Sequence, residues 1–152
     1  MNLLRTLELL IRRKNLIENY FNDNSRVYIN EVNLLANWYL NDLYDYQTAD
    51  SLLHIVEAYS QMVKHNSLEF ALNCNTRAGI YLDFGKTDSC IIYCERAMKI
   101  LEDFNLKNSY LYSSLLNYLA IANKSEGRMS KSLVFSQISY ELVVGLNIIE
   151  ER

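Results

Sequence analysis

The chain carries three cysteines, Cys74, Cys90 and Cys94, whose spacing raises the question of metal or redox chemistry. Cys90 and Cys94 are four residues apart, so a helix would place both thiols on one face, as a shared metal ion would require. No histidine lies at a matching interval, and all three cysteines occupy positions where the apolar pattern predicts small buried side chains. Because a buried free cysteine behaves as a small hydrophobic residue, we favour a structural role for all three. We therefore predict no metal site and no cofactor.

The other groups with catalytic potential are isolated in the sequence. His54 and His65 each lack a carboxylate or a nucleophile at a repeating interval, so surface or helix-end positions are the simpler interpretation. The four glycines are all separate, which excludes a glycine-rich phosphate-binding loop. The HExxH, Walker and GxSxG patterns are absent from the sequence. These observations predict a protein that binds a partner and is not an enzyme.

The sequence repeats itself at an interval of 42 residues. The dipeptide Asn-Ser occurs at 24–25, 66–67 and 108–109, and alanine recurs in step at Ala36, Ala78 and Ala120. Internal repetition at a fixed period of this size is typical of arrays of helical hairpins. We therefore divide a single domain, 1–152, into a helix at 2–21 and three repeats at about 24–65, 66–107 and 108–149.

Each repeat contains two helical patterns around a turn, most clearly in residues 66–107. Apolar side chains recur there with the period of a one-sided helix, at Cys74, Ala78, Tyr81 and Leu82 and then at Cys90, Ile91, Cys94, Ala97, Met98 and Leu101. Gly85 lies where the chain must reverse, and glycine accommodates the backbone conformation of such a turn. Asn66-Ser67 and Thr87-Asp88 precede the two patterns, so we predict that they cap the two helices.

The neighbouring repeats follow the same plan. In the first repeat the pattern predicts helices at 26–43 and 47–64, with Leu43 in the place of Gly85. In the third repeat it predicts two helices on either side of a break at 125–128, where Gly127 takes that place.

The last helix is expected to contain Leu133, Tyr140, Val143 and Val144. Residues 145–147 then align with 103–105, the segment that separates the second repeat from the third. We therefore expect the chain to enter another loop at Gly145, as a piece of a longer array would.

Residues 78–97 resemble the skeleton of a tetratricopeptide repeat, which reads small-x2-Tyr-x3-Gly-x4-Ala-x3-aromatic-x2-Ala. The matching positions are Ala78, Tyr81, Gly85, Cys90, Cys94 and Ala97. The chain departs from the family in its period of 42 rather than about 34 residues, in the absence of a closing proline, and in Leu43 at one turn. The resemblance implies an all-α fold, a right-handed α-solenoid of about seven antiparallel helices, in which the first helix of each hairpin lines a concave surface.

Asparagine occupies one repeated position on those first helices. Asn33, Asn75 and Asn117 each follow a core position by one residue, which turns the side chain by about 100° toward the edge of the same face. An asparagine side chain both donates and accepts hydrogen bonds, as an extended peptide backbone requires. Peptide receptors of the tetratricopeptide type use asparagines in this way, so the resemblance implies a peptide-binding groove. Asn37, Leu40, Leu82, Ile121 and Lys124 would complete its wall.

The alternative is that the matched asparagines reflect composition alone, because 17 of the 152 residues are asparagine. A rival function is the input domain of a bacterial regulator that senses a peptide pheromone. A second rival is a homodimer scaffold formed through exposed apolar ends, at Leu3, Leu4 and Leu7 or at Leu146, Ile148 and Ile149.

Composition narrows the partners further. The net charge is −3 and the basic residues are scattered, so no nucleic-acid-binding surface is expected. The sequence has no run of 18 uncharged apolar residues, and charged residues interrupt its N-terminal apolar positions, so we expect neither a membrane span nor a secretion signal. We therefore predict a cytoplasmic module whose partner is a protein or a peptide.

Overall fold

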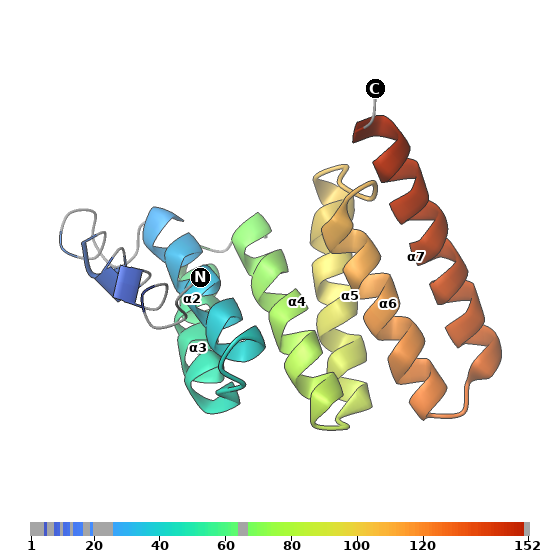
Figure 1. Cartoon of the computed structure of the whole chain (residues 1–152), viewed down its shortest axis with the longest axis horizontal. Coiled ribbons are helices and arrows are strands. Elements are labelled where there is room, and N and C mark those ends of the chain that lie inside the picture. Colours follow the sequence, from blue (N-terminus) through green and yellow to red (C-terminus); the bar gives the residue numbers. More distant parts are fainter. Residues whose placement is uncertain are drawn as a thin grey trace. The chain divides into compact units, whose positions relative to one another are not determined.

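The computed structural model describes residues 26–63 and 67–150, together with isolated positions before residue 26. This part of the chain is all helical and contains no strand (Figure 1), which confirms the predicted all-α class. Its helices are α2 (Arg26–Asn41), α3 (Tyr46–Val63), α4 (Leu68–Asp83), α5 (Thr87–Asp103), α6 (Tyr110–Ser125) and α7 (Met129–Glu150). Most of the helix predicted at 2–21 lies outside the described residues, as do Asn24, Ser25 and Asn66.

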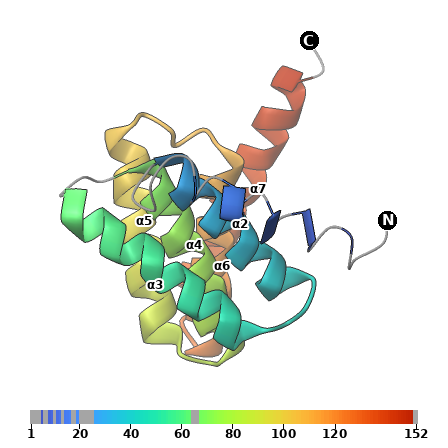
Figure 2. The ribbon, with the colours of Figure 1, turned by 90° about the vertical axis from the view of Figure 1, so that its left-hand side faces the viewer.

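The chain divides into two compact units, Met1–Asn73 and Cys74–Arg152, and α4 begins in the first and ends in the second. In the first unit α2 and α3 lie side by side (Figure 1, Figure 2). Their shared core contains Tyr28, Ile29, Val32 and Val56, with Leu52 packed against it. The two helices of the first repeat therefore bury apolar side chains against each other.

The second unit packs its helices in chain order, with α6 against both α5 and α7. Its core includes small side chains, because Cys74, Ala78, Cys90, Cys94 and Ala97 are all fully buried. Small residues let helix backbones approach closely, and larger residues such as Leu101, Leu115 and Leu119 fill the remaining interior. The predicted core role of the three cysteines is confirmed.

The predicted turns at Gly85 and Gly127 are also confirmed, since both residues have positive φ angles, 68° and 74°. The amide of Gly85 donates to the carbonyl of Leu82, and the amide of Lys86 donates to that of Tyr81. This pair of bonds satisfies the last carbonyls of α4 and requires a left-handed residue, which glycine adopts without a Cβ clash. Gly127 makes the same pair of bonds at the end of α6.

The first repeat turns between its two predicted helices, but its left-handed residue is Tyr44, with a φ of 55°, and not Leu43, which the repeat aligns with Gly85. The amide of Asp45 then reaches back to the carbonyl of Tyr39, one residue further than in the turn at Gly85. This turn is therefore one residue longer, and the 42-residue register shifts by one at this point.

Two Asn-Ser dipeptides mark helix starts through their serines. The hydroxyl oxygen of Ser67 accepts a hydrogen bond from the amide of Phe70, and that of Ser109 accepts one from the amide of Tyr112, both at 3.2 Å. Each serine thus satisfies one of the amides left unpaired in a first helical turn. The predicted cap at Ser67 is confirmed, and Ser109 caps α6 in the same way.

The predicted cap at Thr87-Asp88 is wrong. Thr87 is already the first residue of α5, and Lys86 occupies the capping position without a side-chain hydrogen bond. The Thr87 hydroxyl donates to the Glu126 carboxylate instead, at 2.5 Å. This bond joins the start of α5 to the turn that follows α6.

The closing helix also differs from the prediction, because α7 continues through Gly145 to Glu150 without a loop. Leu133 and Tyr140 belong to this helix as predicted, and they are 68% and 67% exposed. The side of α7 that packs on α6 carries Ser132, which is buried, and Ser139, which exchanges hydrogen bonds with Ser113 on α6. Serine hydroxyls thus form part of the contact between α6 and α7.

Within the described residues, none of the helices combines the length and the apolar character that crossing a lipid bilayer requires.

We expect Ser109→Ala to lower the free energy of unfolding by about 1 kcal/mol, because the amide of Tyr112 loses its capping partner. Urea denaturation followed by circular dichroism measures this. Ser130→Ala is the matched control, since Ser130 is an exposed serine in the first turn of α7. An equal loss of stability in both variants would contradict a capping role.

We expect Gly145→Ala to raise the free energy of unfolding by about 0.5–1 kcal/mol, because alanine is the better helix former. No atom lies within 4 Å of the position that its Cβ would take. Gly85→Ala should instead destabilise by about 1 kcal/mol, because its φ of +68° places the residue in the left-handed region. If Gly145→Ala destabilised the protein as Gly85→Ala does, α7 would not continue through residue 145.

Candidate functional site

The asparagines predicted to line one groove lie in three different environments. Asn33 is fully buried in the first unit, where its side-chain nitrogen donates to the carbonyl oxygen of Glu69 at 2.9 Å. A side chain enclosed in this way is not available to a ligand. The expectation of an open groove therefore fails at Asn33, and also at Leu40, which is buried as well.

Asn75 is half-buried in the second unit and links two helices. Its side-chain oxygen accepts a hydrogen bond from the Ser114 hydroxyl at 3.1 Å, which joins α4 to α6. Asn33 and Asn75 thus make the same kind of contact, each with the first helix of the following hairpin. The repeated position serves helix packing at these two residues.

Asn117 is the exposed member of the series. Its side chain has no hydrogen bond to the residues at 26–63 and 67–150, and Ile121 and Lys124 on the same helix are exposed too. Asn37 and Leu82 are half-buried. Among the residues predicted to form the groove, those of the third repeat are therefore the exposed ones.

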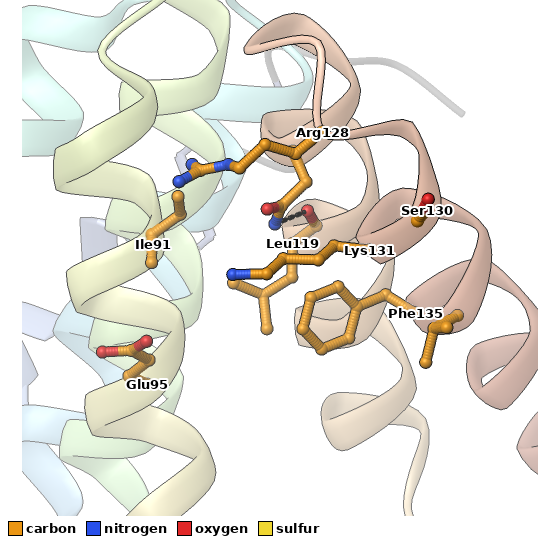
Figure 3. Close-up of a pocket in the computed structure, with 9 residues that line it drawn as sticks. Ile91, Glu95, Leu119, Arg128, Ser130, Lys131 and Phe135 are labelled. Atoms are coloured by element: carbon orange, nitrogen blue, oxygen red, sulfur yellow. Dashed lines mark hydrogen bonds between the residues drawn. The ribbon is translucent and has the colours of Figure 1, made fainter.

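A different concave site lies in the second unit, between α5, α6 and the start of α7 (Figure 3). Its volume is about 460 Å³, within the usual range for small-ligand sites. The lining residues come from all three helices and from the turn after α6: Ile91, Glu95, Leu119, Asn123, Arg128, Ser130, Lys131, Val134 and Phe135. None of them was predicted as a site residue, although two basic residues so close after Gly127 were visible in the sequence.

The pocket combines an apolar floor with a charged rim. Leu119 is buried, and Ile91 and Phe135 are half-buried. Lys131 extends its ammonium group across the pocket toward α5, and Glu95 stands on that helix (Figure 3).

The two cations of the rim differ in their present partners. Arg128 extends toward Ile91 (Figure 3). Its guanidinium also forms an ion pair with the Glu126 carboxylate. Lys131 has no ion pair with the described part of the chain. Lys131 is therefore the cation that a ligand would meet without competing with an existing ion pair.

The floor is held in place by a buried amide. Asn123 donates from its side-chain nitrogen to the carbonyl of Leu119 at 2.7 Å, one helical turn earlier. This bond keeps the polar side chain of Asn123 against its own helix, so that Leu119 presents the apolar surface. The arrangement suits a ligand with one apolar group and one carboxylate.

The cysteines do not form a reactive centre in the second unit. All three are buried as free thiols, and no group of three or more potential metal ligands occurs among the described residues. The hydrogen bond between Cys90 and Cys94 raises the pKa of the Cys94 thiol, with burial, and lowers the pKa of the Cys90 thiol. The two thiols therefore bond to each other inside the core.

A polar network joins the end of α5 to the start of α6. The Tyr112 hydroxyl donates to the Glu102 carboxylate at 2.9 Å, and Lys107 lies 3.1 Å from the same oxygen. Burial, and then the Glu102 carboxylate, raises the pKa of Tyr112 to about 12. The pKa of Glu102 is lowered by its bond with Lys107 and then by that with Tyr112. This network orders a connection and lies outside the pocket.

Comparison with known proteins adds no family to this geometry. No protein-family model matches the chain, and no curated protein sequence matches it either.

We expect Tyr112 to ionise near pH 12 in the folded protein and near pH 10 in the unfolded chain. The raised pKa favours the neutral phenol in the fold. Its stabilising contribution is therefore complete below pH 10 and is lost as the pH rises toward 12.

The difference in absorbance at 295 nm between the wild type and Tyr112→Phe, titrated with and without urea, isolates this one group. A midpoint near pH 10 in the folded protein would show that neither the burial of Tyr112 nor its contact with Glu102 persists in solution.

Proposed function

We propose that this chain is a non-catalytic module that binds a peptide or an extended segment of a partner protein. The observation that supports this function is the pocket between α5, α6 and α7, with its apolar floor and charged rim. Binding sites are typically concave and mostly apolar, with a few polar groups placed to orient the ligand.

The repeat organisation favours the same function. Ser67 and Ser109 cap helices 42 residues apart, and Gly85 and Gly127 end helices at the same interval. We infer stacked hairpins of the tetratricopeptide type, arranged as a right-handed α-solenoid, because such hairpins bury small residues where Cys90, Cys94 and Ala97 are buried here. Solenoids of this kind offer extended surfaces to peptides.

The expected contributions of the contacts to the binding free energy suggest how a ligand would be recognised. An apolar side chain buried on Leu119, Ile91 and Phe135 would contribute about 1.5–3 kcal/mol. An exposed ion pair with Lys131 would contribute less than about 1 kcal/mol. The apolar contact therefore supplies most of the affinity, and Lys131 selects a segment with a carboxylate beside the apolar group.

The asparagine series contributes less than the sequence suggested. Asn33 and Asn75 already hold neighbouring helices, so their removal would weaken the fold before it revealed a ligand. Replacement of all three asparagines would for this reason confuse stability with binding. Variants in the pocket test the function more cleanly, because Lys131 is exposed.

We expect peptides selected from a random displayed library on the wild-type protein to share an acidic residue next to an apolar one. Lys131→Glu removes the ion pair and adds a repulsion between two carboxylates, so the two effects together should weaken binding at least tenfold, which corresponds to about 1.4 kcal/mol, when it is measured by fluorescence anisotropy. Lys124→Glu makes the same change of charge at an exposed position on α6 outside the pocket, and it should alter the affinity by less than about twofold.

Circular dichroism of both variants checks that they remain folded. Failure of the selection to yield any peptide would overturn the proposed function. If Lys124→Glu and Asn117→Ala abolished binding while Lys131→Glu did not, the ligand would lie on the exposed side of α6 instead.

A further inference from the structure

One side of the last hairpin exposes a continuous surface in the second unit. It consists of Tyr110, Asn117 and Ile121 on α6 and of Leu133, Tyr140 and Val144 on α7, which we call the α6–α7 face. On each helix these residues are spaced so that they share one side. A groove of about 500 Å³ runs between the two helices and includes Asn117 and Tyr140 among its lining residues. No described helix covers this face.

The preceding hairpin shows what covers an equivalent face. Asn75 and Gly79 on α4 correspond to Asn117 and Ile121, 42 residues earlier. Asn75 accepts a hydrogen bond from Ser114 of α6, and the Tyr118 hydroxyl lies 3.1 Å from the position of a Cβ on Gly79. An amphipathic helix with hydroxyl groups therefore packs on this side of α4.

The same comparison holds for the second helix of each hairpin. Cys94 and Leu101 on α5, which packs against α6, are at most 1% exposed. Their equivalents on α7, Ser136 and Val143, are exposed and half-buried. The two hairpins thus present corresponding sides, one covered by a helix and the other open to solvent.

We propose that a second copy of this chain covers the α6–α7 face, with α7 of each copy packed against the other. Asn117, Ile121, Leu133, Tyr140 and Val144 carry no charge, and Lys124 in the last turn of α6 is the charged side chain on that side of the helix, so most of two identical faces meets without repulsion. A two-fold contact requires a surface that complements itself, and a surface made mainly of apolar and hydroxyl groups satisfies this.

Helix α7 has the properties of the helix that covers the preceding hairpin. It is exposed along one side, carries Leu133, Tyr140 and Val144 there with the Ser136 hydroxyl between them, and is about 33 Å long. The peptide pocket stays open in such a dimer, because its α7 residues Lys131 and Val134 lie on a different side of the helix.

The test is the mass of the full chain in solution, measured by sedimentation equilibrium from low to high micromolar concentration. We expect a dimer whose dissociation constant rises at least about 100-fold in Tyr140→Glu, since the two-fold axis places two buried carboxylates in one interface. Ile138→Glu is the matched control, because Ile138 is 44% exposed on α7 outside this face, and it should shift the constant by less than about twofold.

A second measurement locates the contact. Tyr140→Cys should form a disulfide-linked dimer under mild oxidation, whereas Ile138→Cys should not. A wild type that is monomeric at every concentration would overturn the proposal, and so would equal effects of the two Glu variants or equal cross-linking of the two Cys variants. Peptide binding at Lys131 should survive in Tyr140→Glu, which separates this inference from the proposed function.

Discussion

Close approach of helix backbones is the constraint on which the second unit depends. Cys74, Ala78, Cys90, Cys94 and Ala97 lie fully buried on α4 and α5, and none of them has a long side chain. Tyr81 and Tyr93 stack at 5.4 Å between their ring centroids, and the guanidinium of Arg77 lies over the Tyr93 ring. A larger residue at one of the small positions would force the helices apart, because interiors packed at this density leave no room for added methylenes. The pocket shares α5 with this packing, and its other residues come from α6, α7 and the turn between them.

Local features of the fold were predictable where one residue determines the conformation. Glycine at 85 and 127 identified the left-handed turn positions, and serine at 67 and 109 identified the starts of α4 and α6. Predictions from the 42-residue alignment failed where a residue of another type occupied the turn or the capping position. Tyr44 adopts the left-handed conformation without being a glycine, and Lys86 precedes α5 without a capping side chain.

The candidate site was less predictable, because the burial of a side chain depends on how the helices pack and not on the residue type. A repeated asparagine has the same donor and acceptor groups whether it faces a ligand or a neighbouring helix. Asn33 and Asn75 bond to the next hairpin, and only contacts distant in sequence distinguish this outcome. The pocket was missed for a related reason. Ile91 and Lys131 are far apart in the chain and meet only after α5, α6 and α7 have packed.

The buried amides of the first unit have a consequence for how such a chain changes during evolution. Asn33 donates to the main-chain carbonyl of Glu69, and Asn73 donates to that of Leu53. A bond to a main-chain carbonyl does not depend on which side chain the accepting residue carries. A substitution at the exchangeable position 69 would therefore leave the bond from Asn33 in place, whereas Leu53 is also held by its own burial in the core. The two asparagines thus fix the spacing of the helices without fixing the type of the residue that accepts the bond.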